Sequence, residues 1–545
     1  MTKWVIALAA ALTWVLPAPA NAAIEQAKTS AGTVEGQVVD GIGEFKGIPF
    51  AAPPVGNLRW KAPQPAIPWT GVRRTVAFGP ACMQGPILAE MGSNAPKSED
   101  CLYLDVWTPA GAPNDKLPVI AWIYGGGFNS GATSVPMYDG ANFAKSGVVF
   151  VSLSYRVGPF GFLASPALSK ESGHGSGNYG LLDLVAGLKW VQDNIARFGG
   201  DPAKVTVMGH SAGSIAVSEL VASPLAKGLF RAAIAESGAN FAPAGDFAGT
   251  NERTLAEAEK SGQAWLDGLG AHTLAEARAL PAATIQNASA KPGARRFWPK
   301  QDGYAIPGDL YQLWQAHDYN DVPILIGTTS DETAAFGNRK VTAAEWVDQV
   351  RKGYGAEANE ILAVLPHATD AEATDSARRL ANATGFHWNM FTWARLQAEE
   401  GTSPAHIYWF DRPSARDPNG SGHGSEVPLV FANEDHRPGR AAWTDADRAL
   451  SNELHSYWVN FAKTGDPNGP GLPEWPAFAP GKPTVLDLGA ETKAIPVPNQ
   501  DLLKAVGDFI TRRNARARSR ARTGLEACVV MSAMGGNQTL LGSGS

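Results

Sequence analysis

The stretch KVTVMGHSAGSIAV, residues 204–217, decides the fold. It predicts a β-branched strand, a Gly-x-Ser-x-Gly turn and the first turns of a helix. Gly209 and Gly213 flank Ser211 at two residues on each side, so strand and helix can pack closely while the hydroxyl stands clear of the sheet. The first N–H groups of the helix then lie where they favour developing negative charge. Ser211 is therefore the candidate nucleophile.

Apolar runs that predict strands alternate with segments of helical spacing along the chain. The helix over 179–198, closed by two glycines, is the clearest of these segments. This alternation predicts an α/β fold with a mostly parallel central sheet and helices on both faces. Ala-rich helical stretches over 239–321 and 341–403 are expected to fold over the edge where the strands end, since ligands bind there. Strands are predicted over 119–124, 148–155, 204–208, 231–236, 322–329 and 405–411.

Composition limits the classes of partner. The 545 residues include 17 Trp and 21 Phe, enough for a large core, and the net charge of -6 gives no reason to expect nucleic acid as a partner. The three glycines at 125–127 lack the following Lys-Ser/Thr of a phosphate-binding loop. A phosphate-binding loop is therefore not expected there, and the serine chemistry described below needs neither a cofactor nor a metal.

The N-terminus has the pattern of a secretion signal. Lys3 precedes an apolar stretch over 4–16, and Ala20-Asn21-Ala22 offers a cleavage site before Ala23. The apolar stretch is too short to span a bilayer comfortably, so no stable membrane anchor is expected. Residues 1–22 are predicted to be a signal peptide and the mature protein to be secreted or periplasmic.

Cysteine usage fits export. A disulfide between Cys82 and Cys101 is allowed in an oxidising compartment and would close a loop of about 20 residues, worth about 3 kcal/mol by loop entropy. Cys528 has no evident partner and lies in an Arg-rich segment. Residues 511–545 are predicted to form a disordered, solvated tail after a domain that spans 23–510.

A serine hydroxyl needs a base to take its proton, and the base needs a carboxylate to orient it. After a turn of this kind the usual chain order is serine, acid, histidine. The segment GSGHGSE, residues 420–426, places His423 in a glycine loop after the strand predicted over 405–411. Loops at that edge of a sheet carry reactive side chains, so His423 is the candidate base.

Spacing along the chain does not identify the carboxylate that orients the histidine. The strand predicted over 322–329 leads into Ser330-Asp331-Glu332, and either carboxylate could face the site. The candidate oxyanion donors are clearer: Gly126 and Gly127 follow a buried strand as bare backbone, and Ala212 offers a third N–H from the turn.

Several segments together resemble the type-B carboxylesterase family, which includes cholinesterases. The resemblance covers residues 30–505. It rests on FKGIPFAAPP (45–54), SEDCLYL (98–104), YGGGF (124–128), NYGLLD (178–183), the serine turn, the Asp331-Glu332 pair and HGSEVP (423–428).

This resemblance implies an α/β-hydrolase fold with helical insertions over the active site. It implies that Glu332, not Asp331, is the acid, that Cys82 and Cys101 are bridged, and that Ser237 supports the acid and the histidine from behind. The implied activity is that of a serine hydrolase that cleaves small-molecule carboxylic esters through an acyl-enzyme.

The chain departs from the family at informative positions. The family commonly has Glu before the serine where this chain has His210, and Gly after the Asp-Glu pair where it has Thr333. The loop between Cys82 and Cys101 has no Trp, so choline esters are not expected to be preferred. For His210, tuning of the pH response and simple packing both stay open.

Two alternatives to ester hydrolysis use the same scaffold. The triad also suits an acyltransferase or an amidase, and some proteins of cholinesterase type are non-catalytic binding proteins. Such binding proteins usually lose the serine or the histidine, and Ser211 and His423 are both present here.

Overall fold

The computed structural model describes residues 23–242, 254–291, 296–337, 340–412, 420–433 and 443–513. The predicted signal peptide over 1–22, Cys528 and residues 514–545 lie outside the described residues. The last described helix covers residues 500–513 and so runs across the tail boundary predicted at residue 510.

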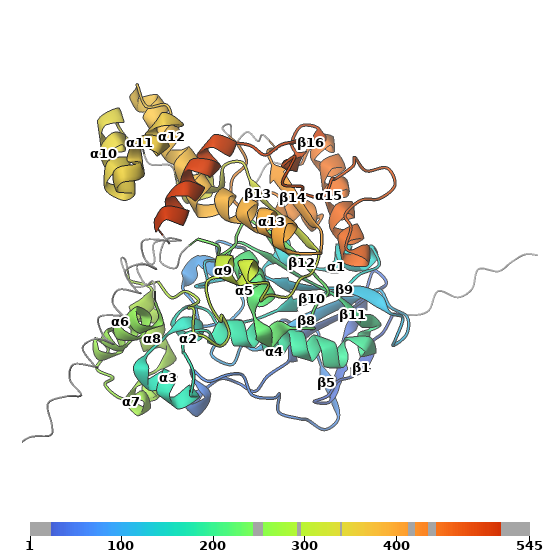
Figure 1. The fold of residues 1–545 in the computed structure, drawn as a ribbon. Helices are drawn as coiled ribbons and strands as arrows, with labels where there is room; N and C mark the ends of the chain where they lie inside the picture. The colour runs from blue at the N-terminus through green and yellow to red at the C-terminus, as the bar shows by residue number, and fades with distance from the viewer. Residues whose placement is uncertain are drawn as a thin grey trace, which may run out of the picture.

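An 11-stranded sheet forms the centre of the fold (Figure 1). The strands in its middle pair in parallel, from Val149–Leu153 through Leu117–Ile123 to Thr484–Leu488, and antiparallel strands complete both ends. The mostly parallel sheet predicted from the sequence is therefore confirmed. Across the sheet the order is β16 (Thr492–Pro496), β15 (Thr484–Leu488), β14 (Ala405–Phe410), β13 (Ile324–Thr329), β12 (Ala232–Glu236), β11 (Gly200–His210), β9 (Leu117–Ile123), β10 (Val149–Leu153), β8 (Tyr103–Thr108), β4 (Ile42–Pro49) and β3 (Gln37–Val39).

Burial explains why these runs form strands. Val119 to Ile123 of β9 are fully buried, as expected for a strand covered on both faces. Each of the six strands predicted from apolar runs is present, with ends that differ by a few residues. Two small sheets at the N-terminal side were not predicted: β1 (Gln26–Lys28), β2 (Thr33–Glu35) and β5 (Val72–Arg74) in one, β6 (Ala81–Cys82) and β7 (Lys97–Ser98) in the other.

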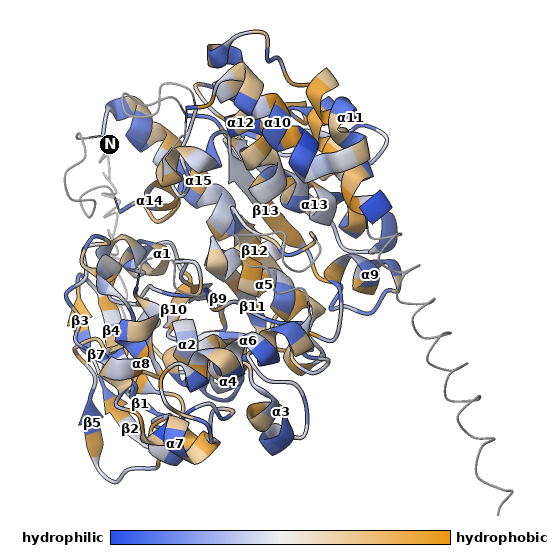
Figure 2. Cartoon of the chain, turned by 90° about the vertical axis from the view of Figure 1, so that its left-hand side faces the viewer, coloured by the Kyte–Doolittle hydropathy of each residue, from blue (hydrophilic) through white to orange (hydrophobic). Residues whose placement is uncertain are grey.

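Helices cover both faces of the large sheet. Figure 2 shows α1, α14 and α15 on one side of the strands and α4, α5 and α13 on the other. The helices are α1 (Ala141–Lys145), α2 (Gly158–Phe162), α3 (Pro166–Ser172), α4 (Tyr179–Asn194), α5 (Ala212–Ala222), α6 (Leu255–Asp267), α7 (Leu274–Ala279), α8 (Ala282–Ser289), α9 (Leu310–Gln315), α10 (Ala343–Tyr354), α11 (Ala358–Ala363), α12 (Asp370–Asn382), α13 (Trp388–Glu400), α14 (Val427–Val430) and α15 (Asp445–Thr464).

The two helical stretches between strands differ in their placement. Helices α6 to α8 stand beside the lower part of the sheet, and α10 to α12 project from its upper end (Figure 1). Helix α13 instead packs against β13 and β14. The expectation that both stretches fold over the strand ends thus fails for α13, whose buried Trp388, Met390 and Trp393 require a covered face.

Candidate active site

A strained turn presents Ser211. Strand β11 ends at His210, helix α5 begins at Ala212, and Ser211 between them has φ 58° and ψ -121°. Such a backbone costs a non-glycine residue about 1–3 kcal/mol and persists where its surroundings enforce it. A Cβ atom on Gly209 would lie 2.5 Å from the carbonyl group of Gly213. The two glycines therefore permit the close crossing of strand and helix that the sequence predicts.

One line of hydrogen bonds joins three residues that are distant in the sequence. The Ser211 Oγ lies 2.8 Å from Nε2 of His423, and Nδ1 of His423 lies 2.5 Å from Oε2 of Glu332. These residues follow the ends of β11, β14 and β13, respectively. Because parallel strands end at the same edge of a sheet, the fold brings them together there.

The Glu332 carboxylate is fully buried, and one of its oxygens accepts two hydrogen bonds. Its Oε1 accepts the N–H of Thr329 at 2.8 Å and the hydroxyl of Thr328. Complete burial opposes ionisation, but the His423 ring and these donors outweigh it and hold the pKa of Glu332 at about 2. The side chain is therefore an anion that can orient His423 and stabilise its protonated form.

The neighbouring Asp331 points elsewhere. Its carboxylate forms an ion pair with Arg378 at 2.9 Å and accepts a hydrogen bond from Nδ2 of Asn382 at 2.9 Å. Its N–H donates to the carbonyl of Ser421 at 2.9 Å, in the loop that carries His423. The two carboxylates that spacing left equal thus take separate places, that of Glu332 at the imidazole and that of Asp331 against Arg378 and Asn382 of α12.

The loop over residues 125–127 offers N–H groups beside Ser211 that have no acceptor among the described residues. Gly126 and Gly127 have φ of 120° and 62°, and the Gly126 carbonyl is held by the N–H groups of Asn129 and Ser130 at 3.1 Å each. Within the described part of the chain, the N–H groups of Gly126, Gly127 and Ala212 donate to no acceptor. Donors fixed in advance in this way suit a developing oxyanion.

Ser237 contacts a carboxylate that sequence reasoning overlooked. Its hydroxyl donates to Oε1 of Glu426 at 3.2 Å, and Tyr408 donates to the same oxygen at 3.1 Å. Among the described residues Ser237 makes no hydrogen bond to Glu332 or His423; the carboxylate that it contacts, Glu426, interacts with both only through charge. Burial, together with the charge of Glu332, raises the pKa of Glu426 to about 7. The sequence signal that could have found Glu426 is its position three residues after His423.

Rings surround the imidazole of His423. The centroid of His210 lies 4.7 Å from it, that of Phe386 5.0 Å and that of Phe336 5.2 Å. Phe336 is 66% exposed, an unusual state for a large apolar side chain. Phe386 sits in a π-helical turn over Ala383–His387, a local feature that no sequence pattern indicated.

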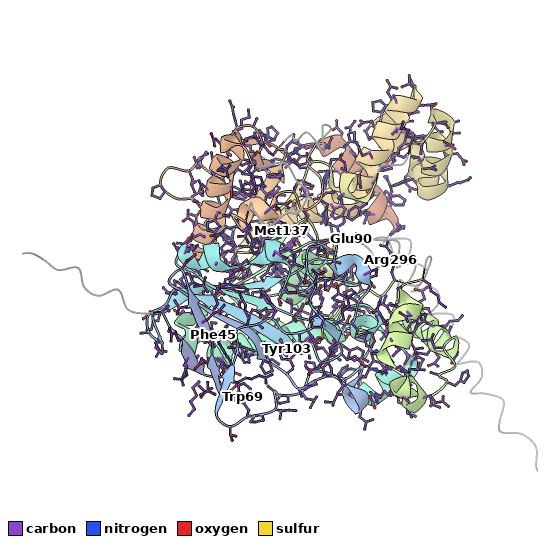
Figure 3. All side chains as sticks on the ribbon, turned by 180° about the vertical axis from the view of Figure 1, so that it is seen from behind. Phe45, Trp69, Glu90, Tyr103, Met137 and Arg296 are labelled. Atoms are coloured by element: carbon purple, nitrogen blue, oxygen red, sulfur yellow. A yellow bond between two sulfur atoms is a disulfide. The ribbon has the colours of Figure 1, made fainter. Side chains whose placement is uncertain are left out.

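A cavity of about 730 Å³ opens beside Ser211 and His423. Its lining includes Ser211, His423 and Gly126, together with Met137 and Arg296, which Figure 3 labels. A second cavity, of about 510 Å³, lies between α4 and residues 62–68 and contains none of them. Of these two cavities, the first therefore contains the candidate catalytic residues.

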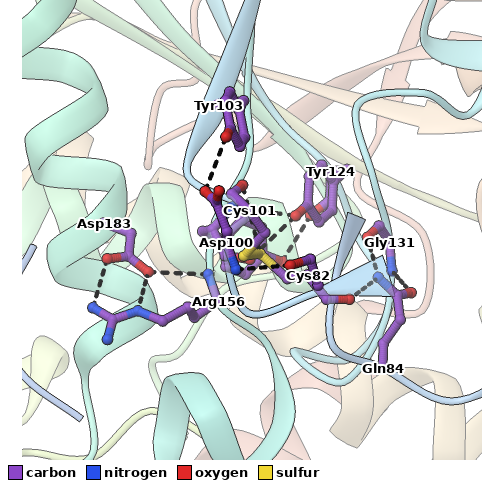
Figure 4. The surroundings of a disulfide bond; sticks show 11 residues. Cys82, Gln84, Asp100, Cys101, Tyr103, Tyr124, Gly131, Arg156 and Asp183 are labelled. Carbon is purple, nitrogen blue, oxygen red and sulfur yellow. Dashed lines mark hydrogen bonds and ion pairs between the residues drawn. A yellow bond between two sulfur atoms is a disulfide. The ribbon is translucent and has the colours of Figure 1, made fainter. Parts of the chain in front are cut away.

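A disulfide joins Cys82 and Cys101 (Figure 4). Two residues after Cys82, the side-chain amide of Gln84 exchanges two hydrogen bonds with the backbone of Gly131, at 2.8 and 2.9 Å. The bridge thus supports the segment that follows the candidate oxyanion donors.

Within the described ranges, no cluster of three or more His, Cys, Asp and Glu side chains could hold a metal ion. None of the helices described there is both long and apolar enough to cross a membrane.

The fold and the serine on its strand-to-helix turn define an α/β-hydrolase. The family model described as the carboxylesterase family matches residues 23–505, and the chain belongs to that family. It is 38% identical to a fumonisin B1 esterase of Sphingopyxis macrogoltabida over 83% of this chain and 84% of that protein. It is 37% identical to a para-nitrobenzyl esterase of Bacillus subtilis over 85% and 94% of the two chains.

Solved structures agree with the family assignment. A carboxylesterase of Geobacillus stearothermophilus superposes with a TM-score of 0.76 at 33% identity, over 88% of this chain and 100% of that one. A PNB esterase structure gives a TM-score of 0.77 at 32% identity, over 88% and 99%. The resemblance inferred from the sequence is confirmed, and the protein is a carboxylic ester hydrolase acting on small molecules.

Proposed function

We propose that the protein cleaves carboxylic esters through an acyl-enzyme formed on Ser211, with His423 as base and Glu332 as the acid that orients it. One observation carries this proposal. A hydrogen-bonded line runs from the Ser211 hydroxyl through both ring nitrogens of His423 to the buried carboxylate of Glu332.

The reaction then follows in two halves. Ser211 Oγ attacks the carbonyl carbon while Nε2 of His423 takes the hydroxyl proton. The bond to the alcohol oxygen breaks, and His423 returns the proton to the departing alcohol. Water attacks the acyl-enzyme with His423 again as base, and the acid product leaves as the Ser211 hydroxyl is restored.

Charge stabilisation has two sources in this scheme. The anionic Glu332 offsets the imidazolium, and its low pKa keeps it ionised throughout the neutral range. The N–H groups of Gly126, Gly127 and Ala212 bind the oxyanion of the tetrahedral intermediate. Removal of one such donor typically costs about 3 kcal/mol of transition-state stabilisation.

The test is the loss of hydrolysis in Ser211→Ala, measured with p-nitrophenyl acetate. We expect kcat to fall by about 10⁴-fold or more. Ser214→Ala is the matched control, because Ser214 is buried in the first turn of α5, three residues after Ser211, and its hydroxyl donates to the carbonyl of Gly238. Wild-type rates in the Ser211→Ala variant would refute the proposal. Product analysis with an added alcohol or amine separates hydrolysis from acyl transfer, and an anilide substrate tests amide cleavage.

We also propose that the protein is exported and that cleavage before Ala23 yields the mature chain. The Cys82–Cys101 disulfide supports this, since such bridges persist in oxidising compartments. The N-terminal sequence of the protein recovered outside the cytoplasm tests it. A chain that keeps Met1 and stays in the cytoplasm would overturn it.

A further inference from the structure

The imidazole of His210 lies directly against the imidazole of His423. Their centroids are 4.7 Å apart and their planes are inclined by 39°. His210 is the last residue of β11, 7% exposed, and lines the same cavity as Ser211. A buried ring at the end of a central strand has little freedom to move, so this contact restrains the ring of His423.

Two glycines hold the His210 ring in place. A Cβ atom on Gly424 would lie 2.9 Å from Cε1 and 3.0 Å from Nε2 of His210, and one on Gly125 would lie 3.3 Å from its Nδ1. These contacts leave no room for a side chain at Gly424 and little toward the ring at Gly125. The ring is therefore clamped between Gly125 and Gly424, the residue that follows His423.

The His210 ring is also uncharged. Its Nε2 is buried without a hydrogen-bond partner among the described residues, which is incompatible with a charged N–H group there. Burial and the neighbouring His423 hold the pKa of His210 well below its usual 6.5, against the opposing pull of Glu332. The groups that face His423 are thus Ser211, anionic Glu332, neutral His210 and, more remotely, Glu426.

Resting on the function proposed above, we propose that His210 is a positioning residue for the base. Its clamped, uncharged ring holds the imidazole of His423 in line with Ser211 and places no second charge beside the imidazolium that forms during reaction. Glu332 is then the principal charged neighbour of that imidazolium.

The experiment compares His210→Ala and His210→Gln with His406→Gln, using p-nitrophenyl acetate at a temperature where all variants are folded by circular dichroism. His406 is the matched control: it is a buried imidazole with an unpartnered Nδ1, packed near Phe461 and Trp475 at the opposite end of β14 from the His423 loop. The readouts are kcat, KM and the acid limb of kcat/KM against pH.

We expect His210→Ala to lower kcat by about tenfold or more with KM changed less than about threefold, because small misplacements of a reacting group are costly. His210→Gln, which keeps a planar polar group in the slot, should retain more of kcat. Its acid limb should superpose on that of the wild type, since one neutral group replaces another. His406→Gln should leave all three readouts unchanged.

A loss of kcat in His210→Ala no larger than in His406→Gln would overturn the positioning role. An acid limb displaced upward in His210→Gln would show that the wild-type ring is a cation, since its removal would then raise the pKa of His423, and would equally overturn the inference. Ser211→Ala in the same assay tests the underlying function: hydrolysis independent of Ser211 would reject that function, whatever the His210 variants do.

Discussion

Two regions meet at the cavity, and they are built by different means. The first is the edge of the sheet, where Ser211, Glu332 and His423 follow strand ends and are joined by hydrogen bonds that end on the buried carboxylate of Glu332. The second is the cavity wall supplied by helical segments, represented by Gln286 of α8 and by Phe336.

Exposure separates the two regions. Glu332 is fully buried, whereas Phe336 is 66% exposed. In the proposed mechanism, groups at the sheet edge contact the atoms that react in every ester, whereas groups of the wall contact only the parts that differ between esters. Substitutions at the edge should therefore change kcat for all substrates alike, and substitutions in the wall should change preference among them.

The largest expected effect is that of Glu332→Gln at the sheet edge. A neutral amide cannot stabilise the imidazolium and can hold His423 in the wrong tautomer, so kcat should fall by about 10³–10⁴-fold. The loss should be the same within about threefold for short-chain and aryl esters. Steady-state kinetics on a panel of p-nitrophenyl and alkyl esters checks this.

Asp331→Asn is the matched control for Glu332→Gln, because it alters the adjacent carboxylate. It breaks the ion pair with Arg378, so stability should fall while kcat per folded molecule is largely kept. Equal losses of kcat in the two variants would contradict the separate places of these carboxylates.

Much of the sheet edge was predictable, because its signals are local. The apolar run of β9 and the glycines around Ser211 specify a strand and a turn within a few residues. The glycines on both sides of His423 indicated this residue as the candidate base. The choice between Asp331 and Glu332 was not available from spacing, since it depends on Arg378 and on the position of His423. The family resemblance, not the local pattern, selected Glu332.

The groups that sequence reasoning missed share one property. Glu426 is buried by Tyr408 and Ser237, which belong to distant strands or their ends. Phe386 reaches His423 from a π-helical turn far along the chain. Burial and orientation that arise from long-range packing leave no periodicity to detect, so these residues became visible only with the fold.

The next effect concerns the disulfide between Cys82 and Cys101. Replacement of both Cys82 and Cys101 by Ser should lower the free energy of unfolding by about 3 kcal/mol, because the unfolded chain gains loop entropy. Urea unfolding of the variant and of the oxidised wild type measures it. Once folded, the variant should keep its kcat within about threefold, since the bridge touches no reacting atom. Unchanged unfolding free energy would contradict the bridge.

A third prediction uses the pH dependence of stability. The folded-state pKa of Glu426, about 7, lies above its ordinary 4.5, so the folded protein holds this proton more tightly. That contribution is complete below the ordinary value and is lost as pH rises through about 7. From about pH 4 to about pH 8, Glu426→Gln should therefore gain about 2–3 kcal/mol of unfolding free energy relative to the wild type.

Urea unfolding of both proteins across this pH range measures the difference, in which the opposite contribution of Glu332 cancels. The buried site at the sheet edge is what raises this pKa, so parallel stability curves would show that Glu426 titrates as an exposed carboxyl. Glu426 would then not belong to the buried groups at the sheet edge.

The smallest effect is expected in the wall. Phe336 stands beside the imidazole of His423, which protonates the departing alcohol in the proposed mechanism. The exposed Phe336 ring can therefore pack against an aromatic alcohol but has nothing to contact in a methyl ester. Phe336→Ala should raise KM for p-nitrophenyl or benzyl esters by about three- to tenfold, leave kcat near the wild-type value, and leave methyl esters unaffected. A loss of kcat that is equal for all esters would instead place Phe336 with the groups of the sheet edge, as a support of His423, and would erase the division between the two regions at this position.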